Sequence, residues 1–250
     1  MQGKVTTSIE NKIGTISFYH PKSNSLPGSL LTELAEAITK LGENENVSVI
    51  ILKSEGEKTF CAGASFDELV SINDYETGKR FFMGFAKVIN AMRKCPKFII
   101  TRVHGKVVGG GVGVVAASDY SFAVETASVK LSELALGIGP FVVGPAVERK
   151  IGKSAFSEMS IDYDWRDAKW AEAKGLYNKV FSTIEELNEE VINLSKKLSE
   201  GSPEAMYELK KVLWEGTENW DELLEQRAEI SGKLVLSDFT KKYIESFKSQ

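Results

Sequence analysis

The sequence of 250 residues has few side chains that could form a disulfide framework or a metal site. It contains two cysteines, Cys61 and Cys95, and two histidines, His20 and His104. Two cysteines cannot build the disulfide network of a small secreted domain, so we expect a reducing compartment and a cytoplasmic protein. No Cys, Asp or Glu lies at metal-ligand spacing from either histidine, and we expect no metal.

Long apolar runs and a surplus of positive charge are also absent. No stretch approaches the roughly 18 apolar residues that a membrane span needs, and no signal-peptide pattern opens the chain. We therefore expect no membrane partner. The formal net charge is −4 and charges of both signs are interspersed, which argues against a nucleic-acid partner, since that would require a basic face.

The first part of the chain alternates between strand-like and helix-like patterns. Apolar residues recur at helical spacing after Pro27 and again from Glu76 to Arg93, and 58–66 is predicted to be a turn around Gly63. Such alternation predicts βαβ units, an α/β fold and a largely parallel sheet. Strands are predicted at Ile13 to Tyr19, Val47 to Leu52, Phe98 to Val103, Tyr120 to Val124 and Val129 to Leu131.

The last third of the chain is helical in pattern. Helices are predicted near 183–200, 203–215, 218–234 and 237–248, and Ser202-Pro203 marks the start of one of them. We expect a βα core over residues 1–190 and a helical C-terminal region over residues 191–250.

The most unusual local feature is the run Gly109-Gly110-Gly111-Val112-Gly113, which lies before an apolar helix. Consecutive glycines cost conformational entropy, so bare backbone must be needed there. A helix start presents free N–H groups suited to a developing oxyanion, while close strand–helix packing without a ligand is an equally good explanation. Neither the dinucleotide fingerprint G-x-G-x-x-G nor a P-loop arises from this run.

A second turn, around Ala62, Gly63 and Ala64, also follows a predicted strand and carries small side chains. Alone it is explained by an ordinary tight turn. Together, the two turns would aim two N–H donors at one carbonyl oxygen, the geometry that stabilises an enolate.

An enolate requires a base, and the segment from Leu131 to Gly137 places Glu133 among apolar neighbours. Loss of solvation would raise the pKa of this carboxyl toward the range of a general base. The alternative is a glutamate on a solvated loop, where most glutamates lie.

Five segments resemble, in order, those of the crotonase (enoyl-CoA hydratase/isomerase) superfamily, over nearly the whole chain. The pattern is closest to that of the Δ3,Δ2-enoyl-CoA isomerases. The segments are His20 to Leu26, Phe60 to Ala64, His104 to Gly113, Leu131 to Gly137 with Pro140, and Ala168 to Leu176 with Val180-Phe181.

This resemblance implies a spiral core of ββα units, a helical C-terminal region used for trimerisation, and a homotrimer or hexamer. It also implies an acyl-CoA substrate, with coenzyme A as part of the substrate and no separate cofactor. The implied oxyanion donors are the backbone N–H groups of Ala64 and Gly110. The implied substrate contacts are Lys22, Asn24, Ser25, Leu26, Ala62, Gly63 and Lys242, the last of these at a CoA phosphate.

One catalytic position departs from the hydratases that the chain resembles. Gly113 stands where they carry the first of two catalytic glutamates, whereas Glu133 matches the second. A single base is enough to shift a double bond, so we predict isomerase activity, with Phe141 as an apolar wall against water. The alternatives are a hydratase that recruits another acid (Asp67, Glu68 or Asp162), or a non-catalytic acyl-CoA binder.

Overall fold

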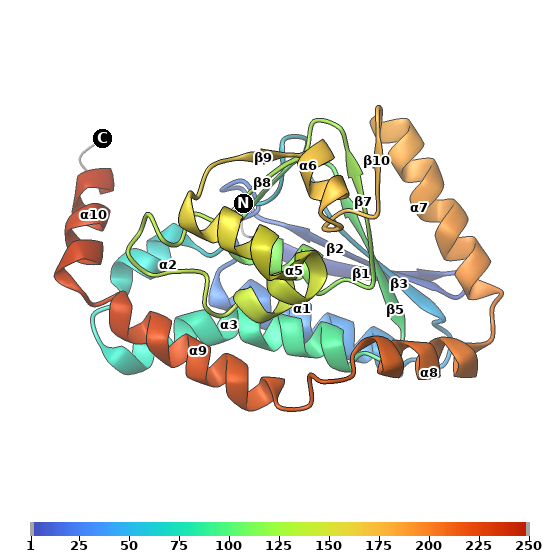
Figure 1. Ribbon diagram of the computed structural model, residues 1–250. Helices are drawn as coiled ribbons and strands as arrows, with labels where there is room; N and C mark the ends of the chain where they lie inside the picture. The colour runs from blue at the N-terminus through green and yellow to red at the C-terminus, as the bar shows by residue number, and fades with distance from the viewer. Residues whose placement is uncertain (1–2, 249–250) are drawn as a thin grey trace.

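Two sheets form the centre of the protein in the computed structural model, which describes residues 3–248 (Figure 1). The larger sheet has the order β1-β2-β3-β5-β7-β10 and the smaller β4-β6-β8-β9. All neighbouring strands are parallel except the pairs β1–β2 and β8–β9. The strands are β1 (Lys4–Glu10), β2 (Ile13–Tyr19), β3 (Val49–Ser54), β4 (Thr59–Cys61), β5 (Phe98–Val103), β6 (Lys106–Val108), β7 (Tyr120–Val124), β8 (Ser128–Lys130), β9 (Arg166–Asp167) and β10 (Lys179–Phe181).

From β3 to β8 the chain alternates between the two sheets, and each pair of strands is followed by a helix. This stacking confirms the predicted spiral of ββα units. The helices are α1 (Gly28–Glu43), α2 (Phe66–Ser71), α3 (Tyr75–Lys94), α4 (Gly110–Ala116), α5 (Gly144–Ile161), α6 (Ala168–Ala173), α7 (Ile184–Ser199), α8 (Pro203–Leu213), α9 (Trp220–Leu234) and α10 (Asp238–Lys248).

Local sequence explains where several helices begin and which face they bury. The side chains of Ser65, Asp74 and Thr183 accept hydrogen bonds from backbone N–H groups in the first turns of α2, α3 and α7. The apolar stripe of α1 is buried against the sheet, as the helical spacing predicted. The central parallel strand β3 is buried on both faces, which explains its run of apolar residues.

Some predicted boundaries were wrong. The strand expected at Val47 to Leu52 is β3 at Val49–Ser54, because Val47 closes a turn by donating to the Asn44 carbonyl. The segment 58–66 is not only a turn, since it contains β4. That three-residue strand exists through its pairing with the distant β6, which local patterns do not reveal. Residue 190, the expected end of the core, lies inside the continuous helix α7.

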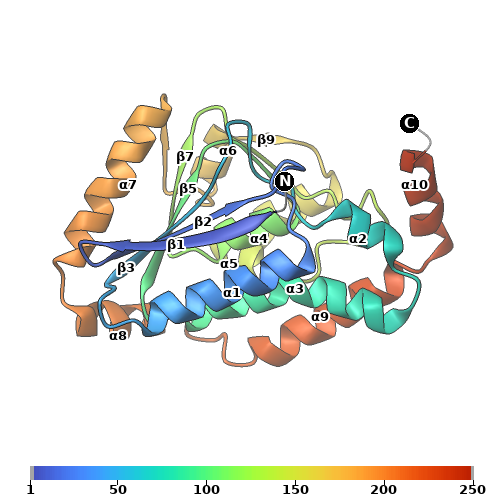
Figure 2. The same cartoon turned by 180° about the vertical axis from the view of Figure 1, so that it is seen from behind.

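The C-terminal helices pack against the spiral from outside (Figures 1 and 2). Helix α9 lies along α3, and a Cβ atom at Gly78 would be 3.0 Å from the Gly232 carbonyl oxygen, so the two backbones cross closely. Lys79 of α3 pairs with Glu225 and Glu229 of α9 at 2.7 and 2.9 Å. Helix α10 stands at the end of the molecule near α2 (Figure 2). Across residues 3–248, no helix has the length and apolar character of a bilayer-spanning segment.

Candidate active site

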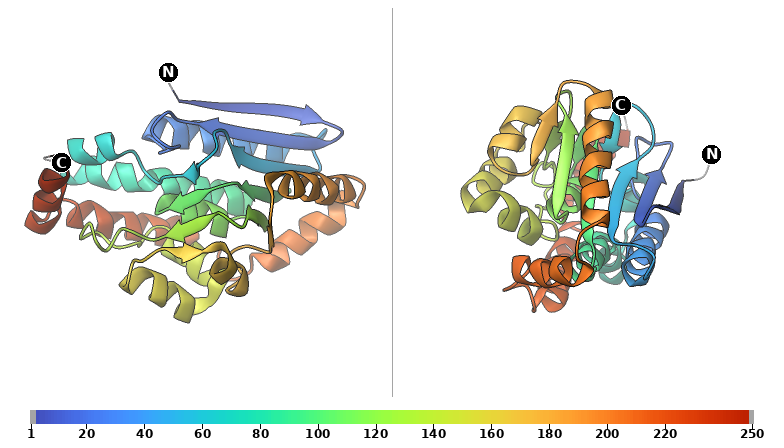
Figure 3. Two further views of the ribbon diagram at one scale, coloured as in Figure 1. Left: turned by 90° about the horizontal axis from the view of Figure 1, so that it is seen from above. Right: turned by 90° about the vertical axis from the view of Figure 1, so that its right-hand side faces the viewer.

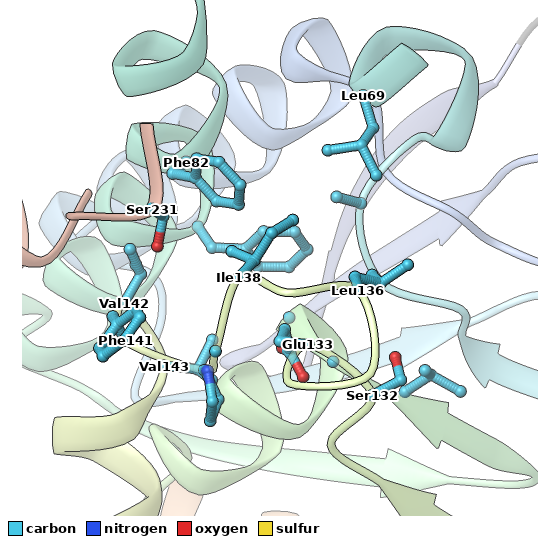
Figure 4. A pocket seen from close by; sticks show the side chains of 18 of the residues that line it. Leu69, Phe82, Ser132, Glu133, Leu136, Ile138, Phe141, Val142, Val143 and Ser231 are labelled. Atoms are coloured by element: carbon cyan, nitrogen blue, oxygen red, sulfur yellow. The ribbon is translucent and has the colours of Figure 1, made fainter. Parts of the chain in front are cut away.

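A cavity of about 520 Å³ lies where the ends of the small sheet meet α3 and the C-terminal helices (Figure 4). Its walls are mostly apolar, and Glu133 is the only carboxylic acid among the described residues that line it. The apolar wall is formed by Phe66, Leu69, Phe81, Phe82, Phe85, Val108, Leu136, Ile138, Phe141, Val142 and Val143.

The two glycine-containing turns meet at this cavity. A Cβ atom at Gly63 would lie 3.6 Å from the Gly110 nitrogen. Leu26 forms a parallel bridge beside Ala64, because its N–H donates to the Gly63 carbonyl at 2.8 Å and its own carbonyl accepts from the Ser65 N–H at 3.2 Å. Within residues 3–248 the N–H groups of Ala64 and Gly110 donate no hydrogen bond. Both donors are therefore available to a ligand.

Steric contacts explain the glycine run. A Cβ atom at Gly110 would lie 2.3 Å from the Phe85 ring, and one at Gly111 would lie 2.8 Å from the Cys61 Cβ. Gly109 has a φ of 54°, and a Cβ atom there would lie 3.1 Å from Oε1 of Glu133. Close packing therefore excludes a side chain at Gly110 and Gly111, and the position of the Glu133 carboxylate excludes one at Gly109.

Glu133 lies in a turn after β8, with its carboxylate among Leu136, Ile138 and Val143 (Figure 4). Its Oε2 atom is buried and has no hydrogen-bond partner among the described residues. Burial raises the pKa of this carboxyl to about 7, although the backbone N–H groups of Glu133 and Ser132 partly oppose the shift. A base with this pKa is half ionised near neutral pH.

Helix α10 supports the loop that carries Glu133. The Thr240 hydroxyl donates to the Leu136 carbonyl at 2.9 Å, and a Cβ atom at Gly137 would lie 2.5 Å from the Phe239 ring. The C-terminal region therefore takes part in shaping the cavity.

Position 113 has no room for a side chain. A Cβ atom at Gly113 would lie 2.5 Å from Cγ1 of Val143 and 3.4 Å from Cδ1 of Ile89. A second carboxylate cannot be placed here without displacing the segment that carries Val143.

We expect Gly113→Ala to lower the free energy of unfolding by about 1–3 kcal/mol, because the added methyl overpacks α4 against Val143. Urea denaturation measures this change. The double variant Gly113→Ala/Val143→Ala provides the control, since it frees the space and should recover part of the loss. Equal stability of Gly113→Ala and the parent protein would contradict the contact.

The three other acids considered for catalysis are engaged outside the cavity lining. Asp67 pairs with Lys22, and Asp162 pairs with Arg166. Glu68 accepts a hydrogen bond from the Gly28 N–H at 2.9 Å. None of these three acids is among the residues that line the cavity.

The predicted substrate contacts divide into two groups. Ala62, Gly63 and Phe141 line the cavity, whereas Lys22, Asn24, Ser25, Leu26 and Lys242 are not among its lining residues. The buried Asn24 amide donates to the carbonyls of Glu55 and Thr59 at 2.7 and 2.8 Å, and Ser25 lies 3.1 Å from the His20 ring. These two side chains fix the loop shape, so any contact with CoA would come from its surface. Lys242 is exposed on α10.

Sequence patterns missed three polar residues of the cavity wall. Tyr163 follows α5, Ser231 lies on α9 and Tyr243 lies on α10. No local motif marks them, because only the tertiary packing of segments far apart in the sequence brings them to the cavity. The nearby Cys61 thiol is buried, which raises its pKa to about 12. In residues 3–248 no three His, Cys, Asp or Glu side chains gather as a metal site would require.

Comparison with known proteins adds independent information. The family model described as enoyl-CoA hydratase/isomerase matches residues 8–249. A probable enoyl-CoA hydratase of Bacillus subtilis (strain 168) is 25% identical over 245 residues, covering 97% of this chain and 95% of the relative. The peroxisomal Delta(3,5)-Delta(2,4)-dienoyl-CoA isomerase of Arabidopsis thaliana is 27% identical over 231 residues, covering 86% and 82%. A crystal structure of enoyl-CoA hydratase from Bacillus halodurans matches with a TM-score of 0.90 at 26% identity, covering 97% of this chain and 99% of that one.

Proposed function

Because this chain belongs to the enoyl-CoA hydratase/isomerase family, and so to the crotonase superfamily of acyl-CoA enzymes, we propose that it isomerises the double bond of an enoyl-CoA. The observation that carries the proposal is that Glu133 is the one carboxylate among the described residues lining an apolar cavity. It lies there beside two backbone N–H groups that donate to no described residue. The closed space at Gly113 supports it further, because hydration commonly shares the proton transfers between two carboxylates.

The proposed reaction needs one base. Glu133 removes a proton from C2 of a 3-enoyl thioester, the C–H electron pair forms a C1–C2 double bond, and the carbonyl π pair moves onto the thioester oxygen. The N–H groups of Ala64 and Gly110 stabilise that negative charge. Protonated Glu133 then returns the proton to C4, which gives the 2-enoyl thioester with no net gain or loss of atoms. The apolar wall at Phe141 keeps water from the intermediate.

Hydration of a 2-enoyl-CoA is the second candidate, since relatives of this chain carry both hydratase and isomerase names. It would require Asp67, Glu68 or Asp162 to leave its present partner and reach the cavity. A non-catalytic acyl-CoA binder is the third candidate.

Side-by-side assays separate the three candidates. We expect a higher kcat/KM for isomerisation of a 3-enoyl-CoA than for hydration of crotonyl-CoA. One carboxylate is enough for the proton transfers of isomerisation, whereas hydration commonly divides its proton transfers between two. Faster hydration would overturn the preference. If the protein is a non-catalytic binder, we expect neither turnover nor deuterium uptake at C2 of a saturated acyl-CoA. Deuterium uptake that depends on Glu133 would exclude the binder hypothesis.

The raised pKa of Glu133 predicts a pH dependence. The base must be ionised, so kcat/KM should fall as the pH drops through about 7, and the profile reports the pKa of the free enzyme. In the unfolded chain the pKa of Glu133 has its ordinary value of 4.5, so the folded protein holds this proton more tightly. Protonation of Glu133 therefore contributes fully to the free energy of unfolding below pH 4.5, and this contribution is lost as the pH rises through about 7. A kinetic midpoint near 4.5 would mean that Glu133 is solvated.

We also propose the homotrimer or hexamer that the family resemblance implies, in the cytoplasm. Helix α8 supports an assembly because it exposes large apolar side chains at Leu209, Val212 and Leu213. Sedimentation velocity would measure the mass, and a monomer would contradict this proposal.

A further inference from the structure

A second hollow, here called the outer groove, lies on the face of the large sheet that packs against α7, beside the strands β1, β2 and β3. It has a volume of about 810 Å³ and shares no lining residue with the cavity that holds Glu133. The right-hand view in Figure 3 shows α7 crossing the sheet with these strands beside it. Six of the lining residues carry a hydroxyl, and those whose side chains share the face of Lys53 are Thr6, Ser8, Thr15 and Ser17.

Two cations stand side by side in this groove. Lys53 of β3 pairs in register with Arg102 of β5, and Ser17 of β2 pairs with Lys53 on the other side. Residues that face each other on neighbouring strands point to the same side of a sheet. Like charges directly opposite one another are destabilising unless something neutralises them.

No acid among the described residues neutralises Lys53 and Arg102. Within residues 3–248 neither Lys53 nor Arg102 forms an ion pair, and the one acid that lines the groove, Glu55, pairs with Lys4 at 3.0 Å. Nε of Arg102 donates to Oδ1 of Asn188 on α7 at 2.6 Å, which fixes the guanidinium. Its terminal nitrogens donate to no described residue. Burial lowers the pKa of Arg102, because desolvation disfavours the charged guanidinium.

One hydroxyl beside the two cations is also unsatisfied. The Oγ atom of Ser17 is buried and has no hydrogen-bond partner among the described residues, while the residue is only 7% exposed. The Oγ atom of Ser54 also has no described partner, but Ser54 follows Lys53 in β3 and therefore points to the other face of the sheet. Buried polar atoms are normally hydrogen-bonded, so each such atom calls for an explanation. The outer groove thus combines two unpaired cations with one spare hydroxyl donor, that of Ser17.

We propose that the outer groove binds a tetrahedral oxyanion, the phosphate or sulfate group of a small ligand, between Arg102, Lys53 and Ser17. An oxyanion accepts hydrogen bonds from guanidinium, ammonium and hydroxyl groups alike, and guanidinium binds it in a bidentate manner. One oxyanion would therefore neutralise the two cations and accept a hydrogen bond from the Ser17 hydroxyl. The site is independent of the reaction proposed at Glu133, so either can fail without the other.

Selenate, an anomalous scatterer, locates such a site directly. Crystals of the full chain soaked in selenate should show an anomalous peak beside Arg102. In solution, inorganic phosphate should bind saturably by calorimetry, and Arg102→Gln and Lys53→Gln should each raise the Kd at least tenfold. Lys53 lies near the end of β3, so we expect Lys53→Gln to fold. This variant therefore still tests the site if Arg102→Gln fails to fold. Lys153→Gln, an exposed lysine on α5 without an ion pair in the described chain, is the matched control and should bind as the parent does.

Glycerol 3-phosphate and inorganic phosphate distinguish the two sources of the anion. A lower Kd for the ester supports a phosphate monoester that also contacts the hydroxyl wall, and an equal Kd supports the free ion. Absence of a selenate peak at Arg102 in the parent protein would overturn the proposal. So would unchanged phosphate binding in both groove variants, or a carboxylate of a neighbouring subunit paired with Arg102.

Discussion

Glu133→Gln is expected to lower kcat for isomerisation of a 3-enoyl-CoA by on the order of 10²–10⁴, the usual contribution of a positioned general base. Glutamine keeps the size of the side chain but cannot accept the proton from C2. The donors at Ala64 and Gly110 remain, so the Kd of a saturated acyl-CoA should change little. Stopped-flow absorbance of the 2-enoyl product and calorimetry with the saturated thioester measure the two quantities.

The control for this variant is Glu148→Gln, which removes an exposed acid on α5 outside the cavity lining and should leave kcat unchanged. A second readout concerns stability. Because Oε2 of Glu133 is buried without a partner among residues 3–248, the neutral amide should stabilise the fold at pH 8 relative to the parent. Full isomerase activity in Glu133→Gln would remove this residue from the mechanism.

Ala64→Pro is expected to lower kcat by on the order of 10²–10³, because it deletes one of the two N–H groups proposed to stabilise the enolate. The hydrogen bonds that hold this segment use the Gly63 carbonyl and the Ser65 N–H, and both remain. The loss should therefore appear mainly in kcat.

Ala64→Gly is the matched control, because it retains the N–H group and should keep most of the activity. Proline also restricts the residue before it, here Gly63, so thermal denaturation must show that Ala64→Pro is folded. A folded Ala64→Pro protein with parental kcat would contradict the role of this N–H as a donor.

Much of the fold could be predicted from the sequence, because strand and helix periodicity is a local property. The alternation in β2 and the apolar runs of β5 and β7 gave the correct strands, and the four C-terminal helices were placed to within about two residues. The short strands β4 and β6 could not be predicted in this way. They are three residues long and exist through pairing with each other across more than 40 residues of chain.

For the candidate site, the order of the residues is enough to predict which chemical groups are present: two turns with small residues, one glutamate among apolar neighbours, and no side chain at Gly113. Their environment depends on the folded structure. It brought Gly63 beside the Gly110 nitrogen, filled the space at Gly113 with Val143, and added Ser231 and Tyr243 from the last helices to the cavity wall. It also buried Oε2 of Glu133, which raises the pKa of that carboxyl to about 7. The reason is physical: solvation and steric room depend on which distant segments pack around a residue, and no local pattern contains that information.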